Sequence, residues 1–262
     1  MNRRTFVTAL PAFAAMAGGA SGLAEQASSF AQEPSSAEAK AAGAVKQLQP
    51  IALPKPEKEG GKSVLAALWE RRTNRNVSAE KLPPQVLSNL LWAAFGVNRE
   101  GGPFGQMGRT AASASNSQEI DLYVALPEGI YLYEAAAHRL APVVAGDQRA
   151  KLGGRGRGGG AATAPVNLIF VADIARFGKA RLQEPGLGDP EVQKAYYNVA
   201  TGLIAGNVYL LAASTGLAAW FQNCNKSGLA ALLKLRADQR VLFAQTVGYP
   251  AKSENRRNAR TS

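Results

Sequence analysis

Apolar residues alternate, or recur at helical spacing, along most of the chain after residue 62. Ile120, Leu122 and Val124 alternate with other residues and predict a half-buried strand at 120–125, followed by a turn at 127–129. The same signals predict further short strands at 130–133, 139–144, 166–171, 217–222 and 241–247.

Apolar residues three and four positions apart predict four helices, at 63–72, 83–96, 190–215 and 227–235. The longest has the clearest limits, because Asp189 can cap its first turn and Gly216 can end it. Helices and strands do not alternate regularly along the chain, so this order predicts an α+β fold.

The helix at 190–215 is apolar on nearly every side. Val199 and Leu203 belong to one stripe, Ile204 and Val208 to another, and small residues such as Gly206 fill much of the rest. A helix that is apolar on most sides is buried on most sides. The other predicted helices are too few to cover it, so we expect a second subunit against it.

The first 31 residues resemble a twin-arginine export signal. Arg3 and Arg4 form the pair, Phe6 follows at the expected offset, and residues 5–24 carry no charge and are rich in Ala and Gly. This stretch is too weakly hydrophobic for stable membrane insertion. We expect a signal peptide at 1–31 and a periplasmic or otherwise exported protein. An uncleaved or mitochondrial-type leader is the alternative.

Composition changes between the signal and the first helix. Residues 32–62 are rich in Ala, Ser, Glu, Lys and Pro and have few large apolar side chains. Such a segment gains little burial to offset the entropy of ordering. We therefore expect a flexible tether at 32–62 and one folded domain at 63–262.

The chain has a formal net charge of +11, and removing residues 1–31 takes away two arginines and one glutamate. The remaining positive charge is scattered, and no nucleic-acid-binding module is recognisable, so we expect no nucleic-acid partner. We interpret the basicity as attraction of anions together with a local phosphate site.

The chain holds one cysteine, Cys224, and one histidine, His138. This excludes an intrachain disulfide and argues against a structural zinc site or a histidine-based triad, so no metal is expected. We interpret His138 as a solvated turn residue. The glycine-rich run at 153–160 contains a G-x-G-x-x-G pattern, but a strand rather than a helix follows it, which argues against dinucleotide binding.

A loop of small residues precedes the strand at 120–125. Ser113, Ala114 and Ser115 leave the backbone accessible to a flat ligand, and Asn116 and Gln118 offer side-chain amides. This combination suits the polar edge of a heteroaromatic ring such as a flavin. A plain polar loop before a strand is the alternative.

A basic cluster ends the first predicted helix. Arg71, Arg72 and Arg75 supply three guanidinium groups around the hydroxyl of Thr73. Arginine binds phosphate through bidentate, charge-assisted hydrogen bonds, so the cluster is a candidate phosphate clamp. Arginine is also favoured in the last turn of a helix by the helix dipole, which is the alternative.

Four segments, in order and spacing, resemble the FMN-dependent nitroreductase superfamily. The loop resembles its S-x-x-N-x-Q segment, and R-R-T-x-R at 71–75 resembles the segment that holds the FMN phosphate and ribityl chain. In addition, R-T-A-A-S at 109–113 is similar to the branch that includes azoline-forming dehydrogenases.

The other two segments lie near the end of the chain. Residues 216–224 resemble the stretch that passes the flavin ring, although Ala218, Asn223 and Cys224 replace the usual glycines. The sequence V-G-Y-P at 247–250 resembles the terminal motif after which basic residues return to the phosphate. The resemblance thus implies Gln222, Asn223, Cys224, Arg256 and Arg257 as further cofactor-binding residues. A disordered basic tail is the alternative for the last two.

The resemblance implies a nitroreductase-like fold, with a central, mostly antiparallel sheet flanked by helices, in an intertwined homodimer with shared FMN sites. The implied activity is transfer of hydride or electron pairs through flavin N5, to or from a small organic or quinone-like substrate. No catalytic acid or base is identifiable. The electron donor is left open between NAD(P)H, a quinol and a protein. A peptide azoline-type dehydrogenase and a non-catalytic flavin-binding protein are the alternatives.

Overall fold

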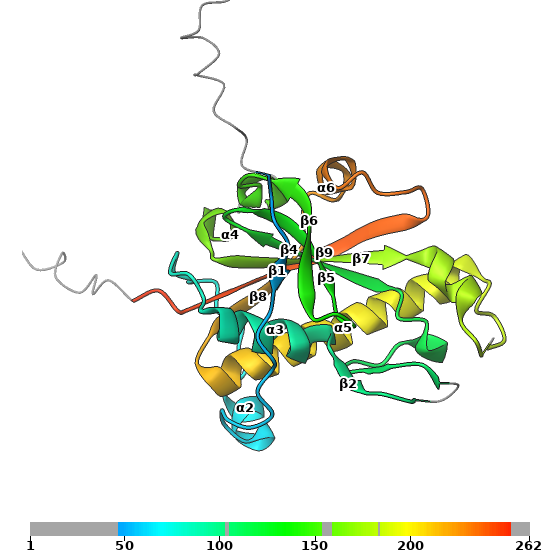
Figure 1. Cartoon of the computed structure of the whole chain (residues 1–262), viewed down its shortest axis with the longest axis horizontal. Coiled ribbons are helices and arrows are strands. Elements are labelled where there is room, and N and C mark those ends of the chain that lie inside the picture. The colour runs from blue at the N-terminus through cyan, green and yellow to red at the C-terminus, as the bar shows by residue number, and fades with distance from the viewer. Residues whose placement is uncertain (1–46, 103–104, 154–158, 183, 253–262) are drawn as a thin grey trace, which may run out of the picture. The chain divides into compact units, whose positions relative to one another are not determined.

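A seven-stranded antiparallel sheet forms the centre of the computed structural model, which describes residues 47–102, 105–153, 159–182 and 184–252 (Figure 1). The strand order is β1-β6-β5-β4-β7-β9-β8. The strands are β1 (Ile51–Ala52), β4 (Ile120–Leu126), β5 (Gly129–Glu134), β6 (Arg139–Ala145), β7 (Val166–Asp173), β8 (Ala218–Gln222) and β9 (Gln239–Gly248). This confirms the predicted α+β class, and each strand predicted from alternation is present.

The centre of the sheet is buried on both faces. Leu122 of β4 lies opposite Phe170 of β7, and Phe170 lies opposite Phe243 of β9. All seven residues of β4 are buried, so the expectation of a half-buried strand is wrong. The polar Asp121, which suggested a solvent-facing side, is instead buried and ion-paired with Arg176.

Helices cover the two faces (Figure 1). The helices α3 (Pro84–Phe95) and α5 (Pro190–Thr215) join one face in the larger core, which includes Leu90, Leu91, Ile204 and Val208. The short helix α6 (Lys226–Leu232) covers the other face through Leu229, which packs with Ile169 and Ala244.

The predicted ends of α5 are confirmed. The Asp189 side chain accepts a hydrogen bond from the backbone N–H of Glu191, and Gly216 ends the helix with φ 78°. A left-handed backbone is accessible to glycine at little cost, and this explains the sharp stop before β8.

Smaller elements lie around this framework. Helix α2 (Val64–Glu70) begins at its Ser63 cap as expected, and α4 (Gly159–Thr163) precedes β7. The hairpin of β2 (Val97–Arg99) and β3 (Gly108–Arg109) was not predicted. Three 3-10 turns complete the described structure: η2 (Ala114–Asn116), η3 (Arg149–Leu152) and η4 (Ile174–Lys179).

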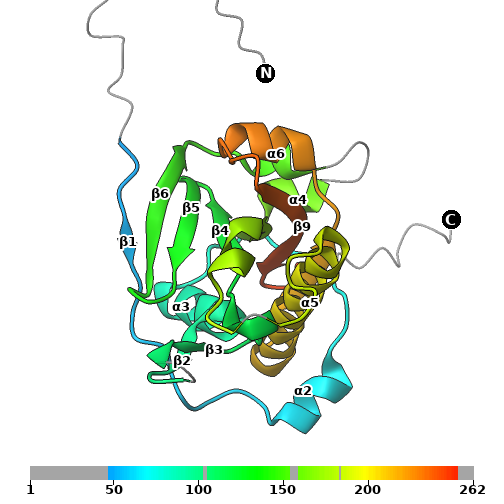
Figure 2. The same cartoon turned by 90° about the vertical axis from the view of Figure 1, so that its right-hand side faces the viewer.

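The described part of the expected tether, residues 47–62, lies on the domain, which corrects the sequence-based expectation (Figure 2). Strand β1 pairs with β6 at the edge of the sheet. The Pro54 carbonyl then accepts hydrogen bonds from Ser88 Oγ at 2.5 Å and His138 Nε2 at 3.1 Å. Leu48, Ile51 and Leu53 also pack against the larger core, so hydrogen bonds and apolar contacts together hold the segment.

These contacts also correct the interpretation of His138 as a solvated residue. Its Nδ1 lies 2.9 Å from the Tyr133 hydroxyl and its Nε2 lies 2.7 Å from Ser88 Oγ. Burial lowers the pKa of His138. The ring therefore connects the N-terminal segment to β5 and α3.

Several predictions fall on residues outside the described ranges. These are the signal peptide at 1–31, the first part of the tether, and the two tail arginines Arg256 and Arg257. Among the helices that the structure describes, none combines the length and apolarity that a membrane span requires.

Candidate functional site

The loop at 113–118 has an unusual backbone. Ser115, Asn116 and Gln118 have φ values of 49°, 52° and 50°. Left-handed conformations are costly for residues with a Cβ, and clusters of them occur preferentially at functional sites, where surrounding structure holds them in place. The loop is therefore more than a polar connection before β4.

Side-chain hydrogen bonds hold this backbone in place. Arg109 Nε donates to Gln118 Oε1 at 2.7 Å, and Gln118 Nε2 donates to the Met107 carbonyl at 2.7 Å and to Asn116 Oδ1 at 3.2 Å. The Gln118 N–H donates to Ser113 Oγ at 3.0 Å. In this conformation the amides of Asn116 and Gln118 bind one another and the hairpin beside them, rather than facing outward as a free polar edge.

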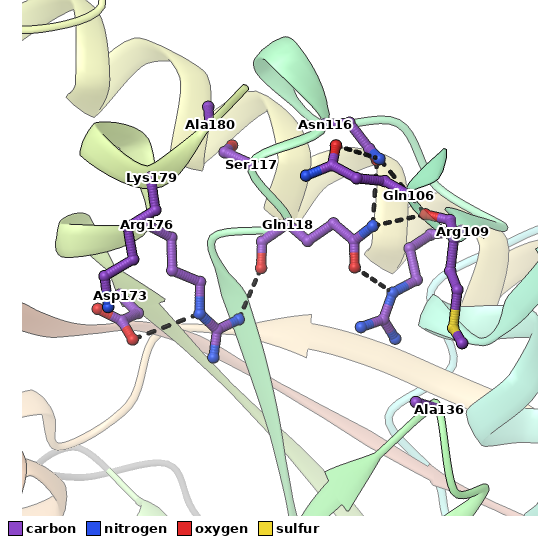
Figure 3. Close-up of a pocket in the computed structure, with 11 residues that line it drawn as sticks. Gln106, Arg109, Asn116, Ser117, Gln118, Ala136, Asp173, Arg176, Lys179 and Ala180 are labelled. Carbon is purple, nitrogen blue, oxygen red and sulfur yellow. Dashed lines mark hydrogen bonds and ion pairs between the residues drawn. The ribbon is translucent and has the colours of Figure 1, made fainter. Parts of the chain in front are cut away.

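A cavity of about 570 Å³ opens beside this loop (Figure 3). Its walls are the segment 106–109, the loop, the turn after β5 at Ala136, and η4. Arg109, Asp173, Arg176 and Lys179 supply its charged groups. This volume suits a small organic molecule.

Ion pairs support one wall of the cavity. Arg176 pairs with Asp121 and, at 3.3 Å, with Asp173, and its Nη1 donates to the Gln118 carbonyl at 2.6 Å. Arg236 Nη2 lies 2.8 Å from the other oxygen of Asp173. Because both Asp173 oxygens are paired, this carboxylate contributes little free negative charge to the cavity.

Glu119 lies fully buried behind the loop. Ser117, which lines the cavity, donates to Glu119 Oε2 at 2.7 Å, whereas Oε1 has no hydrogen-bond partner among the described residues. Burial raises the pKa of this carboxyl group. The loop thus rests on a carboxyl that is costly to ionise.

The second cluster of predicted site residues, at 71–75, lies elsewhere on the domain. Arg71 and Arg72 line a separate cavity of about 470 Å³ with Tyr209 and Gly216. The Arg71 guanidinium lies 5.6 Å from the centre of the Tyr209 ring. Arg71, Arg72 and Arg75 are exposed and form no ion pair among the described residues. Three guanidinium groups without acidic partners suit an anion.

Tyr209 orders this clamp, although nothing in the sequence marked it as a site residue beyond its place in an apolar helix. The Phe221 N–H donates to the Tyr209 oxygen at 2.7 Å. The hydroxyl hydrogen of Tyr209 is then available for Thr73 Oγ1, which lies 3.2 Å away. One side chain of α5 therefore connects the clamp to β8.

The predicted segment at 216–224 lies against the clamp. The Asn74 N–H donates to the Ala219 carbonyl at 2.9 Å, and Gln222 Nε2 donates to Thr246 Oγ1 at 2.9 Å. Asn223 is exposed, but Cys224 is buried in the core beneath α6, and burial raises the pKa of its thiol to about 11. The Cys224 side chain has a packing role, which leaves only its backbone for a ligand.

The V-G-Y-P motif also returns to the clamp. Val77 and Pro250 form an isolated antiparallel bridge, and the Ser78 N–H donates to the Tyr249 carbonyl at 2.8 Å. Pro250 also lines the cavity of the clamp, whereas Arg256 and Arg257 lie outside the described residues.

The structure thus brings together three of the four predicted segments and separates the fourth. The clamp contacts α5 at Tyr209, whereas Ala114 of the loop packs in a cluster with Tyr196 and Tyr197 near its other end. Twelve helical residues span about 18 Å, at 1.5 Å per residue. The cavity beside the loop and the cavity at the clamp share no lining residue among those that the structure describes.

Comparison with known proteins identifies the family. The model of the Nitroreductase family matches residues 68–249, which is more than half of the chain. The chain belongs to the nitroreductase family. Family membership also makes it an oxidoreductase.

Individual relatives agree with this assignment. A solved structure from Ralstonia eutropha JMP134, provisionally named a nitroreductase, is 36% identical with a TM-score of 0.68. That similarity covers 78% of this chain and 90% of the other. A protein from Methanocaldococcus jannaschii, also provisionally named a nitroreductase, is 29% identical over 157 residues, which are 57% of this chain and 73% of that protein.

A more distant structure has the same fold. The NADPH:FMN oxidoreductase from Vibrio harveyi, solved with NAD+, is 18% identical with a TM-score of 0.52. The similarity covers 72% of this chain and 69% of that chain. At this identity the likeness concerns the fold alone.

Proposed function

We propose that this protein is an exported, FMN-dependent oxidoreductase that acts on a small organic or quinone-like substrate. The observation that carries the cofactor assignment is the clamp, in which Arg71 and Arg72 line one cavity with Tyr209, beside Thr73 and β8, and form no ion pair with a described residue. Arg75 follows two positions after Thr73 and is likewise exposed and without an ion pair among the described residues. An unpaired guanidinium cluster fits the phosphate of FMN. Membership of the nitroreductase family supports a flavin cofactor.

FMN supplies hydride or electron-pair transfer when it is bound, and the protein supplies binding and orientation. Arg71, Arg72 and Arg75 would hold the phosphate, and the segment 218–224, which lies against them, would contribute to binding the rest of the cofactor. The loop at 113–118 lines a different cavity from the clamp of its own chain, so we propose that it serves the site of a second chain.

A homodimer is supported by an uncovered apolar surface. Val199 and Leu203 of α5 are 60% and 46% exposed, and Trp69 of α2 is 89% exposed. Gly202 and Gly206 lie on the same side of α5, and a Cβ at either would meet only open space. Large apolar side chains beside small residues form a surface that a partner helix can approach closely.

The spectrum of the purified protein tests the cofactor assignment. We expect visible flavin absorption and release of FMN, not FAD, on acid treatment. A colourless protein whose apo form does not take up FMN would contradict the assignment. Reoxidation of the dithionite-reduced protein by quinones or nitroarenes then distinguishes an enzyme from a non-catalytic flavin-binding protein.

A peptide azoline-type dehydrogenase is the second candidate. Arg109 of the R-T-A-A-S segment directly fixes Gln118 of the loop, so this branch-like motif participates in the site. Reduction of the flavin by an azoline-precursor peptide, in the absence of another donor, favours the oxidative direction. The donor for the reductive direction is NAD(P)H, a quinol or a protein.

Export is proposed from Arg3 and Arg4 and the uncharged stretch after them. Replacing both arginines by lysine is expected to retain the precursor in the cytoplasm, because the twin-arginine route carries folded proteins and is selective for the pair. Cell fractionation and the mass of the processed protein measure this. Unchanged periplasmic processing would show that the arginine pair is incidental.

A further inference from the structure

The cavity beside the loop carries an excess of positive charge that the nitroreductase assignment does not explain. Arg109, Arg176 and Lys179 line it, against the single carboxylate of Asp173. Arg176 and Asp173 pair with one another and with further groups, so they largely cancel. The remaining charges are Arg109 and Lys179, which both line the cavity. In the view of Figure 3 they lie on either side of Arg176 and Gln118.

Arg109 forms no ion pair with a described residue, although Asp121 lies near enough to act on its charge. Its Nε donates to Gln118 Oε1 and its Nη1 donates to the Phe95 carbonyl at 3.0 Å, and both acceptors are neutral. Its guanidinium lies 4.9 Å from the centre of the Phe95 ring. Burial lowers the pKa of this side chain. A partly desolvated cation whose partners are all neutral gains most from an anion.

Lys179 supplies the second charge. It is exposed at the end of η4 and forms no ion pair with any described residue. Gln106 and Asn116 add amide groups to the same cavity. The lining therefore offers two cations and several neutral donors in a space of about 570 Å³.

The geometry points to a substrate that carries an anionic group, a carboxylate or a phosphate, bound in this cavity between Arg109 and Lys179. This inference rests on the proposed flavin-dependent activity and specifies its substrate class. Arg109 acts here as a specificity-determining residue because its positive charge favours an anionic substrate. The same side chain also fixes Gln118 and with it the loop.

The test compares an anionic acceptor with a neutral one of nearly the same size. Protein that has been reduced with dithionite is mixed anaerobically with 4-nitrobenzoate or 4-nitrobenzyl alcohol, and flavin reoxidation is followed at several acceptor concentrations. Lys179→Gln is expected to raise the half-saturating concentration of 4-nitrobenzoate about two- to fivefold relative to that of the alcohol, as for loss of one exposed charge contact. Lys179→Glu is expected to give a larger change in the same direction.

Arg109→Lys keeps the charge but loses the planar fork, so we expect a selective loss of about tenfold for the anion. Lys151→Gln is the matched control, because Lys151 is exposed on η3 and does not line the cavity. The Lys179 variants change an exposed side chain, so the test does not depend on whether the Arg109 variant folds.

A separate binding measurement distinguishes failure of this inference from failure of the flavin assignment. Saturation-transfer NMR with benzoate on the purified protein needs no turnover, and Lys179→Glu is expected to reduce the benzoate signal. Equal changes for the anionic and neutral acceptors, or benzoate binding that is insensitive to Lys179→Glu, would overturn the inference. A selective loss of FMN over riboflavin affinity in Lys179→Gln would overturn it too, because the cavity would then hold the cofactor phosphate.

Discussion

Replacing Arg71 by alanine is expected to weaken FMN binding about ten- to a hundredfold, as expected for loss of one charge-assisted phosphate contact. Arg71 lines the same cavity as Tyr209 and has no acidic partner among the described residues. Its charge is therefore available to a ligand. Titration of the apoprotein with FMN, followed by flavin fluorescence, measures the change.

Riboflavin provides the internal control because it lacks the phosphate. We expect its affinity to change far less in Arg71→Ala. Arg139→Ala is the matched protein control, since Arg139 is an exposed arginine on β6 paired with Glu134. Equal losses for FMN and riboflavin would show that Arg71 acts through folding and not through the phosphate.

Replacing Gly206 by leucine is expected to weaken the homodimer about five- to a hundredfold, as for overpacking of a close contact. A Cβ at Gly206 meets open space apart from the backbone of its own helix, so we expect the added side chain to disturb mainly what a partner places there. Leucine is also a better helix former than glycine, and the monomer fold should not be weakened. Light scattering over a dilution series measures the dimer.

The same variant also tests whether the flavin site is shared. If the loop at 113–118 completes the site of a second chain, loss of the dimer and loss of FMN should occur together. Ala137→Leu, at an exposed position of the β5–β6 turn, adds an apolar side chain away from α5 and should change neither. A stable monomer of the unmodified protein that retains FMN would disprove both the interface and the shared site.

Local signals in the sequence were sufficient to predict most helices and strands of the fold. Asp189 and Gly216 act within one helical turn of the residues that they cap, so the ends of α5 could be predicted without any tertiary contact. The alternation of apolar and polar residues located strands β4 to β9 for the same reason, but it could not show whether both faces of a strand are buried. Asp121 looked like a solvent-facing residue until the structure placed Arg176, which is 55 residues away, against it.

The N-terminal segment shows the limit of composition. Residues 47–62 have too few apolar side chains to predict order. Packing of Leu48, Ile51 and Leu53 against the core nevertheless holds them on the domain, together with hydrogen bonds from Ser88 and His138 to the Pro54 carbonyl. Those partners lie 34 and 84 positions away in the chain. No pattern within the segment itself could have indicated them.

The sequence by itself determined the family, the α+β class and the four segments of the candidate site, because these depend on residue identity and short-range spacing. Only the tertiary structure decided how those segments are distributed. It gathered the clamp, β8 and V-G-Y-P around Tyr209, and it placed the loop at 113–118 near the other end of α5. It also brought Arg109 and Lys179, 70 positions apart, to one cavity. Which of these segments lie close together depends on how a 26-residue helix crosses the sheet. No local sequence pattern predicts that crossing.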